Sequence, residues 1–103
     1  EKELTYLPIS KYPSVERDIA LILEDDILMD NIIKVIKQTG KEQLVNLTLF
    51  DIYKGENIAE GYKSVALKLE FNDRFKTLES KDVDKLVNRI IKRLEYEYKA
   101  EIR

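Results

Sequence analysis

Three side chains that could bind a planar, hydrogen-bonding ligand stand close together in the sequence: Asp51, Tyr53 and Ser64. Side chains alternate across a strand, so Asp51 and Tyr53 share one face of the β-rich segment that contains them. On the following β-rich segment, alternation puts Ser64 and Ala66 beside them. A phenol can stack on a planar ring, while a carboxylate and a hydroxyl hydrogen-bond its edge, as single-stranded RNA recognition requires.

The hydrophobic pattern predicts the elements that position these residues. In chain order they are a strand over 19–23, a helix on apolar positions 29, 32, 33 and 36, strands over 43–53 and 62–71, a helix with an apolar stripe from Val83 to Leu94, and an edge strand through Ala100 and Ile102. We expect Gly40 to cap the end of the first helix and Ser80 to be the N-cap of the second.

The order β-α-β-β-α-β predicts an α+β, ferredoxin-like fold with a four-stranded antiparallel sheet. Two helices can cover one face of such a sheet, so the other face stays open and is the predicted RNA-binding face. On the covered face we expect Phe50 and Ile52 to join the core with the apolar residues of segment 62–71. Phe71 and Phe75 are expected in or near that core.

Composition narrows the possible functions. A chain of 103 residues with 44% hydrophobic content fits one domain with a modest core, and no apolar run approaches the roughly 20 residues of a membrane span. The absence of Cys and His excludes disulfides, thiolate or imidazole metal sites and Ser–His nucleophiles. The formal charge of -2 gives no global attraction to nucleic acid, so RNA binding needs a local site.

No catalytic site, metal or cofactor is expected in this chain. No pair of carboxylates stands in an apolar setting that would separate their pKa values, and three scattered glycines form no phosphate-binding loop. The chain begins without Met and carries both prolines within residues 1–16. We therefore expect a piece of a longer protein, with residues 1–8 as an extended lead-in from a preceding domain and 9–103 as the folded domain.

Several short strings, in order and spread over residues 9–103, resemble the C-terminal ferredoxin-fold anticodon-binding domain of the bacterial phenylalanyl-tRNA synthetase beta subunit. The strings are Tyr12-Pro13-Ser14, Arg17-Asp18-Ile19-Ala20-Leu21, Leu49-Phe50-Asp51-Ile52-Tyr53-Lys54-Gly55, Lys63-Ser64-Val65-Ala66, Thr77-Leu78 and Ile102-Arg103. Each string is weak by itself, and their shared order and spacing make the resemblance specific.

The resemblance implies a module that binds the anticodon stem-loop of the phenylalanine transfer RNA, tRNA(Phe), while other domains aminoacylate it. In that family the open sheet face receives the first anticodon base, a guanine, and matching carries over Ala20, Asp51, Tyr53 and Ser64. It further implies a cytoplasmic parent ligase that uses ATP and Mg²⁺ outside these residues. Its partners would be the rest of the beta subunit and an alpha subunit in an alpha2-beta2 tetramer, with neither membrane nor DNA.

Each of these residues also has an ordinary structural interpretation. Tyr53 would be the stacking platform, or a cross-strand aromatic that shields a sheet. Asp51 would accept hydrogen bonds from guanine, or pair with Lys54 or Lys63. Ala20 would let a base approach the strand closely, whereas a Ser such as Ser64 means little on its own.

Phosphate contacts would position the RNA without specifying its sequence. The candidate cations around the sheet are Lys11, Arg17, Lys54, Lys63, Lys68, Arg74 and Lys76. From these we select Arg17, Lys54 and Lys63, although Arg17 could instead pair with Asp18. The basic run on the second helix (Lys85, Arg89, Lys92 and Arg93) is interleaved with Asp84, Glu95 and Glu97, which favours a solvated helix face.

Two other classes of function are compatible with such a scaffold. It can serve as a small-molecule regulatory or protein-interaction module, and the fold alone does not separate that function from RNA binding. An acylphosphatase-like enzyme would need a phosphate-binding loop with Arg after the first strand. Glu24-Asp25-Asp26 stands there instead, and its acidity repels phosphate.

Overall fold

The computed structural model of the chain describes residues 12–102. Its elements are β1 (Val15–Glu24), α1 (Met29–Gly40), the 3-10 turn η1 (Lys41–Gln43), β2 (Leu44–Tyr53), β3 (Tyr62–Phe71), α2 (Ser80–Tyr98) and β4 (Glu101–Ile102). This order confirms the predicted β-α-β-β-α-β arrangement. The predicted lead-in over residues 1–8 lies outside the described residues.

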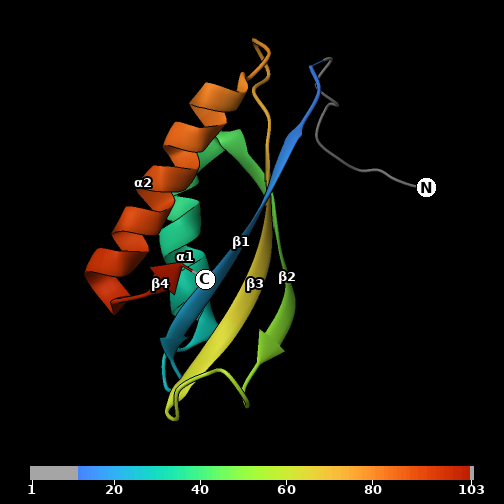
Figure 1. The fold of residues 1–103 in the computed structure, drawn as a ribbon. Helices are drawn as coiled ribbons and strands as arrows, with labels where there is room; N and C mark the ends of the chain where they lie inside the picture. Colours follow the sequence, from blue (N-terminus) through green and yellow to red (C-terminus); the bar gives the residue numbers. More distant parts are fainter. Residues whose placement is uncertain (1–11, 103) are drawn as a thin grey trace, which may run out of the picture.

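The strands form one four-stranded antiparallel sheet in the order β2-β3-β1-β4. The long strands β1 and β3 pair along their whole length in the centre, and β4 adds a two-residue edge next to Leu21 and Ile22. Both helices lie on the same side of this sheet (Figure 1). The predicted ferredoxin-like fold with one uncovered sheet face is therefore confirmed.

The hydrophobic core fills the space between the helices and the central strands. Its fully buried side chains come from both layers: Leu21, Leu23, Val65, Leu67, Leu69 and Phe71 from the sheet, and Ile32, Ile36, Val83, Ile90 and Leu94 from the helices. All the sheet residues in this set have the same parity within their strand, as alternation requires. The opposite parity of β1 and β3 is left to the open face.

Three predicted core positions are wrong. Phe50 is the extra residue of a β-bulge between Leu49 and Asp51, and 55% of it is exposed. Ile52 lies opposite Val65 on the helix-covered side, but it stands near the end of an edge strand and stays 48% exposed. Phe75 belongs to the loop between β3 and α2 and is 85% exposed.

Both predicted helix caps are shifted. The N-cap of α2 is Glu79, whose backbone N–H donates to the Asp82 carboxylate at 3.3 Å in a capping box. Gly40 is the last residue of α1 rather than its cap, and Lys41 follows it at φ 55°. Glycine is required at position 40 for a packing reason, since a Cβ there would lie 2.7 Å from the Leu44 Cβ.

Candidate nucleic-acid interface

The register of the sheet brings residues from three strands into rows across the open face. One row joins Ala20, Ala66 and Asp51, because Ala66 of β3 pairs with Ala20 of β1 on one side and with Asp51 of β2 on the other. The next row joins Ile22, Ser64 and Tyr53 in the same way. The four residues predicted from the sequence therefore lie together, on two adjacent rows.

A β-bulge at Phe50 puts Asp51 and Tyr53 on the open face. Strict alternation would place Leu49 on the same face as Asp51, yet Leu49 pairs with Leu67 and packs against the core. The extra residue in the strand resets the alternation, so that the next ladder pair is Asp51 with Ala66. The bulge thus lets β2 bury its leucines and still present the carboxylate and the phenol outward.

Asp51 is exposed, and among residues 12–102 no hydrogen bond or ion pair uses its carboxylate. The two lysines considered as its partners are bonded elsewhere. Lys54 pairs with Asp25, and Lys63 donates to backbone carbonyls. An exposed carboxylate with free lone pairs can accept two hydrogen bonds from adjacent N–H donors of a ligand.

Tyr53 is a partly exposed aromatic ring, at 40%, that is held in place at its hydroxyl end. The hydroxyl donates to the backbone carbonyl of Glu56 at 3.2 Å. The same oxygen would lie 3.2 Å from a Cβ placed on Gly55, so the ring tip fits against the glycine of the β2–β3 loop. A ring fixed in this way can serve as a stacking surface at little additional entropic cost.

Ser64 has the expected register but not the expected exposure. It lies opposite both Ile22 and Tyr53, yet only 5% of it is exposed. Its hydroxyl therefore belongs to the floor of the site rather than to its accessible surface. Ala20 is half-buried beside it on β1.

Ala66 and Ile22 complete the floor, and both were missing from the residues predicted for the site. Ala66 stands between Ala20 and Asp51, so two small side chains form a low surface next to the free carboxylate. Alternation alone had placed Ala66 on the open face. Ile22 could be identified only from the pairing of β1 with β3, which places it opposite Ser64, a residue far along the chain.

The three cations selected from the sequence do not gather on this face. Arg17 lies opposite Leu69 on the helix-covered side, and its Nε contacts the Asp84 carboxylate of α2 at 3.4 Å rather than that of Asp18. Lys63 donates to the carbonyls of Ile27 at 2.7 Å and Asp25 at 3.2 Å. These contacts use Arg17 and Lys63 to join elements of the fold.

Lys54 and Lys68 are the better placed cations. Lys54 follows β2 and contacts the Asp25 carboxylate at 2.7 Å, with 59% of its side chain exposed. Lys68 is exposed on the open face one row beyond Ala66, between Asp18 and Thr48. The sequence pattern had placed Lys68 among seven candidate cations but not among the three selected.

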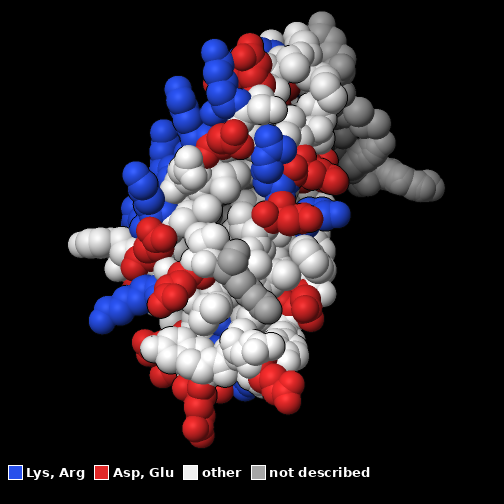
Figure 2. Space-filling model, viewed as in Figure 1, with Lys and Arg blue, Asp and Glu red and all other residues white. Residues whose placement is uncertain are grey.

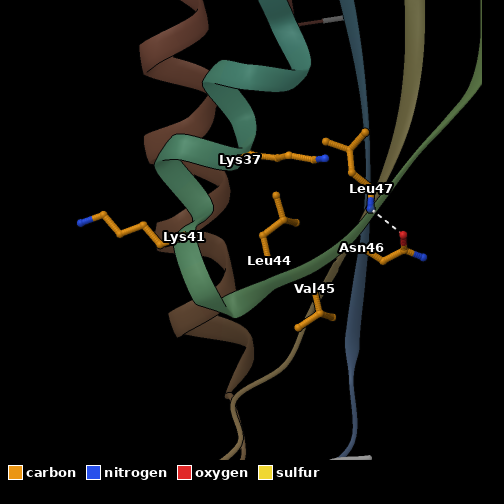
Figure 3. A pocket seen from close by; sticks show the side chains of 6 residues that line it. All are labelled: Lys37, Lys41, Leu44, Val45, Asn46 and Leu47. Atoms are coloured by element: carbon orange, nitrogen blue, oxygen red, sulfur yellow. Dashed lines mark hydrogen bonds between the residues drawn. The ribbon is translucent and has the colours of Figure 1, made fainter. Parts of the chain in front are cut away.

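A hollow of about 350 Å³ on the described surface is bordered by the end of α1 and the start of β2. Figure 3 shows Lys37 reaching from α1 toward β2 there, while Asn46 accepts a hydrogen bond from the Leu47 N–H at 3.0 Å. None of Ala20, Asp51, Tyr53 and Ser64 lines this hollow, so it is separate from the candidate site on the open face.

Among the described residues no helix has the length and apolar character to cross a membrane. Over the same residues, no group of three or more acidic, His or Cys side chains could hold a metal ion. Near Asp51 the open face offers an aromatic ring, a free carboxylate and small apolar residues, and farther along β1 and β3 it also carries Lys68 and the carboxylates of Glu16, Asp18 and Glu70.

These features define a class of protein, a ferredoxin-like α+β domain whose uncovered sheet face has the groups needed to bind a nucleic-acid base. Comparison with known families makes the assignment specific. Residues 10–103 match the family described as the ferredoxin-fold anticodon binding domain, and the chain belongs to that family.

Similar curated proteins are beta subunits of phenylalanine–tRNA ligase. The one from Clostridium acetobutylicum is 45% identical over 98 residues, which cover 95% of this chain and 12% of that protein. The one from Bacillus licheniformis is 42% identical over 101 residues, covering 98% and 13% respectively. The chain thus spans about an eighth of the length of these relatives.

A solved structure shares the architecture at low sequence identity. A putative PII-like signaling protein from Thermus thermophilus superposes with a TM-score of 0.50 and 18% identity, covering 87% of this chain and 84% of that one. At this identity the likeness concerns the fold alone.

Proposed function

We propose that this chain is the anticodon-recognition domain of a phenylalanine–tRNA ligase beta subunit and binds the tRNA(Phe) anticodon loop on its open sheet face. The observation that carries the proposal is the exposed, unpaired carboxylate of Asp51 beside the fixed ring of Tyr53, in a chain of the anticodon-binding family. The names of the relatives support phenylalanine as the amino acid of the parent ligase, and the geometry of Asp51 and Tyr53 supports base binding on the open face.

In the proposed complex the first anticodon base, a guanine, stacks on Tyr53. Stacking on an aromatic side chain is worth about 1–3 kcal/mol and is similar for all bases. The small side chains of Ala20 and Ala66 let the base come close to the sheet, and Ser64 supports the floor beneath it.

Selectivity would come from Asp51. The Watson–Crick edge of guanine presents two adjacent N–H donors, which one carboxylate can accept together. Adenine presents a lone pair at the corresponding ring nitrogen, and a carboxylate repels it. Because stacking does not distinguish the bases, the carboxylate is the specificity-determining group in this proposal.

Phosphate contacts would fall to Lys68 and Lys54, which are exposed near the site. Arg17 and Lys63 have no such role in the proposal, because both are engaged on the helix-covered side or in the β1–α1 connection. With so few cations, the open face by itself should contribute only a modest affinity for the stem-loop and little of its salt dependence.

The rest of the proposal concerns the parent protein. A ligase of this kind joins phenylalanine to tRNA(Phe) at the expense of ATP, with Mg²⁺, and we place those sites in the other domains. We also propose a cytoplasmic alpha2-beta2 assembly in which this domain acts only in binding.

The experiment is a binding titration of the 103-residue chain with a fluorescent RNA hairpin that carries the phenylalanine anticodon. Tyr53→Ala and Asp51→Ala should each weaken binding at least about fivefold, whereas Phe75→Ala, which removes an exposed ring from a distant loop, should not. Tyr53→Phe keeps the stacking surface but loses the hydroxyl bond to Glu56 that fixes the ring, so its affinity should lie between those of the wild type and Tyr53→Ala. Unchanged affinity in both site variants, with wild-type melting temperatures, would rule out the proposed site.

A further inference from the structure

A second hollow, of about 580 Å³, lies between the end of α1 and the middle of α2. Its lining is strongly basic and contains no acidic residue: Gln38, Thr39, Lys41, Arg89, Lys92, Arg93 and Tyr96. We call this surface the basic groove. Figure 2 shows Lys and Arg side chains gathered along α2, whereas the opposite end of the molecule carries Asp and Glu. In a protein of net charge -2, the basic groove itself is lined by four cations, Lys41, Arg89, Lys92 and Arg93, and by no carboxylate.

The acidic residues that interleave with this basic run in the sequence separate from it on the helix. At 100° per residue, Lys85, Arg89, Lys92 and Tyr96 form a single i, i+4, i+7, i+11 line. Asp84 and Glu95 lie about 80–100° to one side of that line, and Glu97 lies about 120° to the other. The interleaving therefore does not neutralise the line.

The cations of the groove are largely available to a ligand. Arg93 pairs with Glu97 one turn away. For Lys41, Arg89 and Lys92 no ion pair occurs within the described residues, and all three are exposed. The C-terminal end of α1 contributes about half a negative charge there, which four cations outweigh.

An exposed aromatic ring stands at the end of the basic line. Tyr96 is 86% exposed and lines the groove beside Lys92 and Arg93. An aromatic ring that is left in water next to cations is the combination found in proteins that bind single-stranded nucleic acid, where cations hold the backbone and rings stack on bases.

From the basic line, the free cations and the exposed Tyr96, we propose that the basic groove binds the sugar–phosphate backbone of an RNA segment, with Tyr96 stacking on one of its bases. The line from Lys85 to Tyr96 spans 11 helical steps of about 1.5 Å each, or about 16 Å. A helical nucleic-acid strand presents about five phosphates over that length. An acidic protein segment would use the cations but leave the Tyr96 ring without a partner.

This RNA segment would be a second contact, separate from the base on the sheet face. The groove is built from the two helices, which cover the side of the sheet opposite to Asp51 and Tyr53. One nucleotide cannot reach both surfaces. The inference does not rest on the proposed anticodon recognition, since either surface could bind RNA without the other.

The test is the salt dependence of RNA binding by the 103-residue chain, measured with fluorescent oligo(U) and with the anticodon hairpin between about 50 and 200 mM salt. The groove variant is the double substitution Arg89→Gln and Lys92→Gln. The matched control is Arg74→Gln and Lys76→Gln, which removes the same charges from the exposed loop before α2. Tyr96→Ala tests the ring.

Log affinity falls as log salt rises, and we expect the groove variant to make this slope shallower by about 1.4, whereas the control should leave it nearly unchanged. Tyr96→Ala should weaken oligo(U) binding about fivefold or more. If the groove variant binds both oligo(U) and the hairpin more weakly, the groove is a general RNA-binding site. If it binds only the hairpin more weakly, the groove is specific for transfer RNA. Both results agree with the proposal. Adding Tyr53→Ala to each protein separates the two surfaces, because the groove effect should persist in its presence.

Two results would overturn the proposal. Equal slopes for the groove variant and the control would show that only overall charge matters. Wild-type RNA binding by the groove variant, together with lost binding of poly-glutamate, would assign the groove to an acidic protein partner instead.

Discussion

Replacing Gly55 by Ala tests how the β2–β3 loop fixes the ring of Tyr53, the proposed stacking surface. Gly55 has φ +138°, and a Cβ added there would lie 3.2 Å from the Tyr53 hydroxyl. That hydroxyl also donates to the carbonyl of Glu56 at 3.2 Å. The substitution therefore strains the backbone and at the same time pushes the tip of the ring by a few tenths of an ångström.

The two effects have different magnitudes. A non-glycine residue at such a φ costs about 1–3 kcal/mol, and the reduced freedom of the unfolded chain returns about 0.4–1 kcal/mol. A net loss of about 1–2 kcal/mol lowers the melting temperature by about 4–8 °C per kcal/mol in a domain of this size. Displacement of the ring should remove about 1 kcal/mol of the stacking energy, or about fivefold in affinity.

Gly61→Ala is the matched control. Gly61 lies in the same loop at φ +88°, but nothing lies within 4 Å of a Cβ added there. Thermal denaturation should show a comparable loss of stability in both variants, while the titration with the anticodon hairpin should show weaker binding for Gly55→Ala alone. Equal binding losses in the two variants, or wild-type binding by Gly55→Ala, would refute the idea that this glycine positions Tyr53.

Three further predictions concern the rest of the fold. Asn72 is buried and donates through Nδ2 to the Tyr12 carbonyl at 2.9 Å, so Asn72→Ala should lower the free energy of unfolding by about 1–3 kcal/mol in urea denaturation; an unchanged midpoint would contradict this. The pKa of Asp73 lies below its usual 3.8 because the Phe75 N–H and then the Gln43 amide donate to it. Asp73 thus contributes stability that is complete above pH 3.8 and lost as the pH falls through the lower folded pKa, so Asp73→Asn should flatten the stability profile there but not near neutrality. Ile90 is fully buried, so Ile90→Ala should lower the free energy of unfolding by about 2–5 kcal/mol. Phe75 is exposed, so Phe75→Ala should change it by no more than about 0.5 kcal/mol. Similar losses at both positions would contradict the assigned core.

The elements whose signals are local were predictable from the sequence. The apolar stripes of α1 and α2 repeat at helical spacing, and the two β-rich runs on either side of the loop at Gly55 and Gly61 match β2 and β3 closely. The first strand was predicted too short, at 19–23 rather than Val15–Glu24. Its additional residues, including Glu16 and Asp18, are polar and are held in the sheet by β3, a partner that local pattern does not reveal.

The side of the sheet that carries the candidate site was predictable from the sequence. The burial of its residues and the partners of its cations were not. Alternation gave Asp51 and Tyr53 the correct side because the bulge at Phe50 precedes them, while the residues before the bulge have the opposite parity. The burial of Ser64 depends on neighbours across strands, and the engagement of Arg17 and Lys63 depends on Asp84 and on the β1–α1 connection. Ion pairs and burial of this kind follow from the packed structure and not from spacing along the chain.

The most direct test of the anticodon proposal compares two hairpins that differ only in the first anticodon base, guanine or adenine, against the wild-type chain and Asp51→Asn. The side-chain amide that this substitution introduces would offer a donor as well as an acceptor, so it keeps the size of the side chain and removes the acceptor-only character. We predict that the wild type favours guanine by about tenfold or more and that Asp51→Asn loses most of this preference, because guanine affinity falls and adenine affinity rises once the repulsive carboxylate is gone. Equal affinity of the wild type for both hairpins, or a guanine preference that survives in Asp51→Asn, would contradict recognition of the first anticodon base by Asp51.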